Sequence, residues 1–254
     1  MKKKEEIAQL NKLLKKIKVN LKAFLQSENQ EELHQFRVQV KKLKAVLTLY
    51  AYEKKNKNLL KYFKPIKEAF AKAGEIRNAH INLKLGEQYQ LNETFHQQQQ
   101  QLLNSSLADF KKNNNLYLKS IKKAKINLQT HTHRLHNKTI RKFYKDKVLT
   151  INQFFADPAF NEDLHTARKN IKLLIYNHTN AAAALQNKLQ LNLKYLDELQ
   201  DNIGEWHDHI LTMKLLAATG NATDAAIANL KSTNENSENI ILDLSSNFKD
   251  KVKS

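Results

Sequence analysis

The chain has 254 residues and a formal net charge of +18, and it contains no cysteine. This charge exceeds what solubility requires and predicts a polyanionic partner, while the absence of cysteine excludes disulfides, thiolate metal sites and thiol nucleophiles. Only 4 Gly and 2 Pro interrupt a composition rich in Leu, Lys, Ala, Gln and Glu, which predicts an all-helical (all-α) fold.

Apolar residues at helical spacing predict four helices in the first half of the chain. The second of these opens at a capping box, Ser27-x-x-Gln30, and its buried stripe ends at Tyr50. Pro65 lies near the first turns of the third helix or kinks it. The first, third and fourth helices are expected at about residues 4–26, 58–86 and 93–127.

The second half repeats this plan, so eight helices are expected in all. Asp157-Pro158 ends the first of its helices and Gly220 ends the third. The segment where the halves meet lacks Gly and Pro, which predicts two domains packed together, residues 1–129 and 130–254. The four helices of this half are expected at about residues 131–156, 160–178, 181–219 and 222–252.

Two motifs recur in register across the halves, which indicates an internal duplication. Residues 32–41 and 163–172 share the pattern acidic-Leu-His-x-x-Arg-x-x-x-Lys, and residues 74–78 and 204–208 both begin with Gly-Glu. The His-to-Gly spacing is 40 residues in the first half and 39 in the second. A His/Arg/Lys row that occurs twice points to an anionic ligand.

The first copy of this row occupies one face of its helix, because its members fall within roughly 80° of arc and rise about 15 Å along the axis. Two such tracks indicate one long ligand. A bound phosphate would restore the charge of a His that neighbouring cations hold neutral. The rows consist of His34, Arg37, Lys41 and Lys44, and of His165, Arg168 and Lys172 with Lys169 beside them.

Gly74 and Gly204 lie inside strong helical patterns, where each costs about 1 kcal/mol relative to Ala. Their matching positions in the repeat indicate the close approach of a neighbouring helix. Arg77 and His207, from the same motifs, are then expected to face the basic rows.

Two further basic rows occur at helical spacing. They rank lower, because a chain this rich in Lys shows such rows by chance on solvated faces. The repeated row stands above them because it occurs twice in register and includes His and Arg. The two weaker rows are Lys15, Lys18 and Lys22, and Arg134, Lys138, Arg141 and Lys145.

A catalytic site has little support in the sequence. Residues 207–209, His-Asp-His, are possible ligands of an HD-type metal-dependent phosphohydrolase. The equivalent residues 77–79, Arg-Asn-Ala, cannot supply such ligands, and no other His-Asp cluster completes the set. The chain also lacks a GxxxxGK phosphate loop and a Ser/His/Asp signature. We therefore expect no catalysis, no metal and no cofactor.

These motifs resemble those of a known family. Residues 33–44, with Lys42 at one of the basic positions, resemble the H-x-x-R-V-x-x-R-R-L-R helix of the CHAD family of histidine-bearing α-helical domains. Residues 164–172 resemble the second signature helix of that family, and residues 74–78 and 204–208 are similar to its two G-x-x-R-D segments. The resemblance covers nearly the whole chain.

The resemblance implies two four-helix bundles related by a pseudo-two-fold axis and packed around a basic central groove or pore. This groove would bind inorganic polyphosphate through both rows, and the domain itself would have no enzymatic activity. The second half is expected to grip more weakly. Leu173 and Ile175 stand where its signature usually has basic residues, and His207 stands where it usually has Arg.

Other partners compete with polyphosphate. A sequence-nonspecific nucleic-acid-binding protein is the main alternative, because a charge of +18 would bind DNA or RNA by counterion release. However, aromatic residues suited to base stacking are sparse beside the rows, and no helix-turn-helix pattern occurs. An anionic membrane would require exposed Trp, Phe or Leu opposite the lysines.

The location is expected to be cytoplasmic, at polyphosphate granules. The basic start Met1-Lys2-Lys3-Lys4 is not followed by the apolar segment of a signal peptide. No apolar run reaches the ~18 residues of a membrane span. The length of polyphosphate and the oligomeric state stay open.

Overall fold

A computed structural model describes residues 3–219 and 224–253 of the chain. Over these ranges the chain forms only helices and connecting turns, without a strand, which confirms the all-helical prediction. Its contacts divide it into two compact units. Unit 1 comprises Met1–Gln88 and Asn92–His136, and unit 2 comprises Tyr89–Leu91 and Asn137–Ser254. The expected domain boundary at residues 129–130 lies inside a helix of unit 1.

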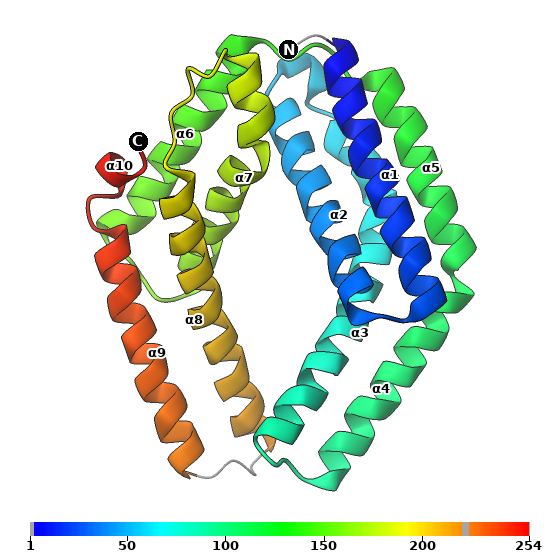
Figure 1. The fold of residues 1–254 in the computed structure, drawn as a ribbon, viewed down its shortest axis with the longest axis vertical. Coiled ribbons are helices and arrows are strands. Elements are labelled where there is room, and N and C mark those ends of the chain that lie inside the picture. Colours follow the sequence, from blue (N-terminus) through cyan, green and yellow to red (C-terminus); the bar gives the residue numbers. More distant parts are fainter. Residues whose placement is uncertain (1–2, 220–223, 254) are drawn as a thin grey trace. The chain divides into compact units, whose positions relative to one another are not determined.

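Unit 1 contains five α-helices and two short 3-10 helices (Figure 1). Helix α1 packs along α2 and α5, and α3 packs along α2, α4 and α5. The α-helices are α1 (Lys3–Ser27), α2 (Gln30–Tyr50), α3 (Lys64–Gln88), α4 (Glu93–Lys112) and α5 (Asn114–His131), and the 3-10 helices are η1 (Lys54–Asn56) and η2 (Leu59–Phe63).

The core of unit 1 follows from apolar residues three and four positions apart. On α1, Leu10, Leu14, Ile17 and Leu21 are all buried, and each such side chain contributes about 1.5–3 kcal/mol when fully buried. Polar contacts hold the segment after α5 against the same helix. The buried Glu6 carboxylate accepts the backbone N–H of Leu135 at 2.8 Å. Burial raises the pKa of Glu6, although this hydrogen bond acts in the opposite direction.

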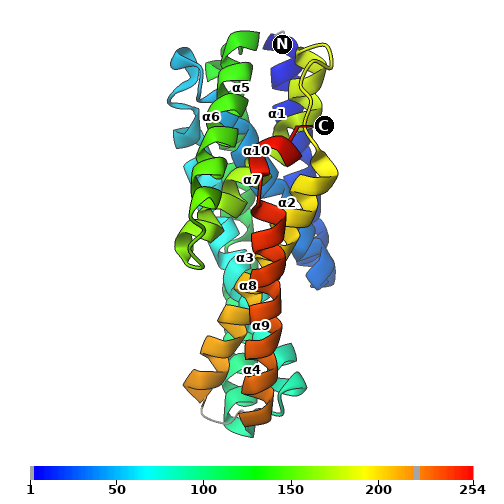
Figure 2. The ribbon, with the colours of Figure 1, turned by 90° about the vertical axis from the view of Figure 1, so that its left-hand side faces the viewer.

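The described part of unit 2 contains four long helices, α6 to α9, and one short helix, α10 (Figure 2). Helix α7 packs against α6 and α8, and α8 packs against α9. The short α10 returns to α6, where the rings of Phe155 and Phe248 lie 5.3 Å apart. The helices are α6 (Asn137–Ala156), α7 (Glu162–Ala184), α8 (Leu193–Thr219), α9 (Asp224–Ser245) and α10 (Phe248–Lys251).

The predicted helix ends of the first half need correction. The capping box at Ser27 is wrong, because α1 includes this residue and its hydroxyl donates to the carbonyl of Ala23. Asn29 is the actual N-cap of α2, and its side chain accepts the N–H of Glu31 at 2.7 Å. The expected helix 93–127 is divided at Asn113.

The second half differs from the prediction in three places. Residues 132–136 form no regular secondary structure, so α6 begins at Asn137. Helix α7 runs on to Ala184, and α8 starts only at Leu193. Near the C-terminus, Asn247 adopts a left-handed conformation with φ of 53° and separates α9 from α10. The stop predicted at Gly220 lies outside the described residues.

Candidate functional site

The first row lies on α2 as its spacing requires. His34, Lys41 and Lys44 are exposed, whereas Lys42 and Arg37 are partly buried. The opposite face is apolar and belongs to the core of unit 1. The row therefore forms a cationic surface on one side of α2, with the guanidinium as its deepest group.

Arg37 ties α2 to α3. Its Nη1 donates to the backbone carbonyl of Phe70 at 2.8 Å, and its guanidinium lies 4.4 Å from the centre of the Phe70 ring. A Cβ added to Gly74 would lie only 2.8 Å from the same nitrogen. Burial, and to a lesser extent the charge of Arg77, lowers the pKa of Arg37 to about 10. The group is therefore a cation at neutral pH.

Unit 2 repeats this arrangement between α7 and α8. Arg168 donates from Nε to the carbonyl of Gln200 at 2.8 Å. A Cβ on Gly204 would lie 2.8 Å from Cζ of Arg168 and 3.0 Å from its Nε. In both units the arginine thus bonds the carbonyl four residues before the glycine. The shared pattern places the two motifs of each half in one site.

The role of the glycines is therefore different from the one predicted. They make room for an arginine side chain, and not for a neighbouring helix as such. In a helix, the carbonyl of residue i accepts the N–H of residue i+4. A residue without Cβ at i+4 leaves that carbonyl open to a second donor. This need for space explains why Gly74 and Gly204 stand where Ala would favour the helix.

Two histidines of unit 2 lie together. The rings of His165 on α7 and His207 on α8 are stacked with centroids 4.3 Å apart and planes 18° apart. Nδ1 of His165 is buried and has no hydrogen-bond partner. Burial, together with the charges of Lys169 and His207, lowers the pKa of His165 to about 4, although Glu162 acts to raise it. The ring is therefore neutral in the free protein at pH 7.

We expect the affinity for phosphate anions to rise as the pH falls, in part through His165. An anion bound at the row would raise the pKa of this ring from about 4, so binding takes up a proton between that value and the pKa of the bound state. Titration calorimetry in buffers of different ionisation enthalpy measures this uptake. His165→Gln should reduce the uptake at pH 6. An unchanged uptake would exclude His165 as the linked group.

Two carboxylates oppose the row of unit 2, and the sequence analysis missed them. Burial and the charge of Arg168 lower the pKa of Lys172, whereas Asp201 and Asp197 on α8 act to raise it. Counted from the glycines, these two positions correspond to Lys67 and Ala71 in α3 of unit 1. The carboxylates that act on Lys172 compete with an incoming anion and reduce the free positive charge of the unit 2 row.

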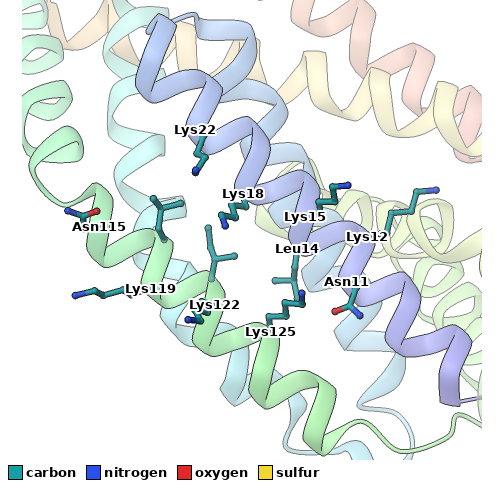
Figure 3. Close-up of a pocket in the computed structure, with 12 residues that line it drawn as sticks. Asn11, Lys12, Leu14, Lys15, Lys18, Lys22, Asn115, Lys119, Lys122 and Lys125 are labelled. Carbon is teal, nitrogen blue, oxygen red and sulfur yellow. The ribbon is translucent and has the colours of Figure 1, made fainter.

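The two weaker rows lie on other elements than the α2 and α7 rows. Lys15, Lys18 and Lys22 line a groove between α1 and α5 to which no residue of the α2 row contributes (Figure 3). The row from Arg134 to Lys145 is only in part a helical row. Arg134 lies in the irregular segment before α6 and belongs to unit 1, whereas Lys138, Arg141 and Lys145 are on α6 in unit 2. All four of these side chains are exposed.

No metal centre is formed by the part of the chain that the structure describes. Across residues 3–219 and 224–253, no three or more His, Asp or Glu side chains are grouped to hold a metal ion. His207 stacks on His165 and lies 3.9 Å from Asp208, whose side chain is mostly exposed. Over the same residues, no helix has the length and apolar character needed to cross a bilayer.

Comparisons with known proteins agree with the motifs. The crystal structure of the CHAD domain from the plant Ricinus communis resembles this fold with a TM-score of 0.62 at 15% sequence identity, over 92% of this chain and 84% of that one. The comparison with curated proteins gave no match. The family model described as "CHAD domain" matches residues 8–217, which include both basic rows and both glycine motifs. The chain therefore belongs to the CHAD domain family.

Proposed function

We propose that this protein binds inorganic polyphosphate, without catalysis, through the basic rows of α2 and α7. The observation that carries the proposal is the arginine held against a glycine in each unit, with lysines and a histidine beside it. Ordering a side chain costs conformational entropy. Here the arginine is already ordered before any ligand arrives, so less of the binding free energy is lost.

Phosphate groups are suitable ligands for these residues. A guanidinium offers five N–H donors, and the carbonyl bond accounts for one donor atom in each arginine. Lysines along the same helix add point charges for successive phosphate groups. Family membership supports the same ligand class, since the resemblance that predicted this family also implied polyphosphate.

We also propose that one polyphosphate chain binds both rows, as the central groove implied by the resemblance would require. That groove remains a prediction. The stoichiometry tests it, because a shared ligand predicts one long chain per protein molecule. Two independent rows would instead bind two short chains, and the unit 2 row, with Asp197 and Asp201 beside Lys172, would bind the second more weakly.

Chain length is the first test of this function. We expect polyphosphate of tens of phosphates to bind much more tightly than tripolyphosphate, because the α2 row alone extends about 15 Å. Titration calorimetry at fixed ionic strength measures both, with single-stranded DNA of the same phosphate count as control. Equal affinity for tripolyphosphate would replace the track by a compact pocket. Equal affinity for the DNA would favour the nucleic-acid alternative.

Binding should occur without turnover. The protein mixed with long-chain polyphosphate or a nucleoside triphosphate, and with Mg²⁺ or Mn²⁺, should release no phosphate above background. Phosphate release that disappears in His207→Ala or Asp208→Ala would contradict this expectation. It would identify a phosphohydrolase that uses the His-Asp-His segment.

A further inference from the structure

A second basic surface lies on unit 1, apart from the proposed polyphosphate rows. It is a groove of about 850 Å³ between α1 and α5 (Figure 3). Helix α1 contributes four lysines to it, Lys12, Lys15, Lys18 and Lys22. Helix α5 contributes three, Lys119, Lys122 and Lys125, and no Asp or Glu lines the groove. Lysines from two adjacent helices thus line one groove.

These lysines have no internal partner. Among the described residues, none of the seven forms an ion pair or donates a hydrogen bond to an acidic side chain. All seven are exposed. Like charges gathered on two adjacent helices repel one another and reduce the stability of the packed state. An anionic partner bound in the groove would remove this repulsion.

The floor of the groove is apolar, which narrows the chemistry of that partner. Leu14, Leu118 and Ile121 lie between the two lysine rows. Leu118 is the most accessible of the three, since Leu14 is 2% and Ile121 4% exposed. A phosphate chain gains nothing from these side chains. A partner that carries acidic groups and also apolar ones gains from both, because it can bury this surface.

We propose that the α1–α5 groove docks an acidic amphipathic helix of a partner protein. Apolar residues of that helix would contact Leu118 and its neighbours, and its Asp and Glu would pair with the lysines on either side. From Lys12 to Lys22 the α1 row rises about 15 Å, which matches roughly three turns of a bound helix. An apolar stripe flanked by carboxylates is a pattern that short peptide helices use to bind grooves.

Two synthetic peptides test this assignment. The first is a labelled 14-residue peptide with leucines on one helical face and glutamates flanking them, and the second has the same composition in scrambled order. Fluorescence anisotropy with the full chain should show the amphipathic peptide binding at least about tenfold more tightly, because only it presents both surfaces together. Equal affinity for the two peptides would overturn the proposal, since charge alone would then explain binding.

A pair of matched double variants locates the site. Lys18→Glu with Lys122→Glu should lower the affinity for the amphipathic peptide by at least about tenfold, because like charges would face its glutamates. Lys231→Glu with Lys249→Glu removes the same net charge from exposed positions in unit 2 and should change affinity by less than about twofold at physiological salt. Equal losses in the two variants would overturn the groove as the site.

Variants without a charge change test the apolar floor. Leu118→Gln should lower the affinity for the amphipathic peptide several-fold. Thermal unfolding checks that α5 still packs in this variant. Leu118→Ala serves as the second variant, because it removes most of the same apolar side chain and keeps a residue that favours the helix. Peptide binding that survives both changes would show that the apolar contacts play no part, and the proposal would fail.

Polyphosphate itself supplies the last discrimination. In a protein that carries Arg37→Ala and Arg168→Ala, the amphipathic peptide should bind as in the wild type, whether or not the proposed polyphosphate function holds. If long-chain polyphosphate displaces the peptide from this variant at low concentration, the groove is a general polyanion site and the helix proposal is overturned. Failure of polyphosphate binding at the α2 and α7 rows leaves the peptide result unaffected.

Discussion

Replacing Arg37 and Arg168 by Ala should lower the affinity for long-chain polyphosphate by roughly two to four orders of magnitude. A hydrogen bond to a charged group contributes about 1.5–3 kcal/mol, and each 1.4 kcal/mol is a tenfold change in affinity. Both guanidiniums are fixed before binding by the carbonyls of Phe70 and Gln200. Their loss therefore removes both the charge and the order of the site. Titration calorimetry at fixed salt measures the change.

The matched control removes two lysines at exposed positions, Lys231→Ala and Lys249→Ala, and deletes the same formal charge. This pair should lose much less affinity, because screened surface charges contribute little. Lys111 is a poor control because it forms an ion pair with Glu28. Circular dichroism must show that both proteins remain helical. Equal losses in the two proteins would mean that net charge alone accounts for binding.

The sequence predicted where helices lie better than where they end. Apolar spacing located α1 and α2 because burial of one face dominates helix stability in a folded protein. Helix ends depend on which of several polar side chains makes the capping bond. Ser27 and Asn29 are both good N-cap residues, and only the structure shows that Asn29 takes this role while Ser27 bonds back to Ala23.

The basic rows followed from the repeat, but the way in which each arginine is held did not. Two glycines in register indicated a close approach, and the sequence could not reveal whether a helix or a side chain approaches. The acidic residues that act on Lys172 could have been predicted from the sequence. Counting from Gly204 places Asp197 and Asp201 where unit 1 has Lys67 and Ala71, and this comparison alone predicts a weaker second row.

The second large effect concerns stability, and it comes from the space that the glycine leaves for the arginine. Gly204→Ala should destabilise unit 2, since the new Cβ would displace the Arg168 guanidinium from the Gln200 carbonyl. That loss is about 1.5–3 kcal/mol, and the gain in helix propensity returns only about 1 kcal/mol. In an Arg168→Ala background the same change should instead stabilise the protein by up to about 1 kcal/mol. The effect of one substitution thus reverses its sign.

Unfolding in urea, followed by the fluorescence of Trp206, measures the free energy of unfolding of the four proteins. These are the wild type, Gly204→Ala, Arg168→Ala and the double variant. Trp206 is the single tryptophan of the chain, is buried in α8 two residues after Gly204, and donates to Glu238 on α9, so it reports on unit 2. The matching cycle with Gly74 and Arg37 should show a smaller coupling, because a Cβ there meets only the tip of the guanidinium; it needs circular dichroism as its readout. Additive effects of Gly204→Ala and Arg168→Ala would show that the glycine is not there for the arginine.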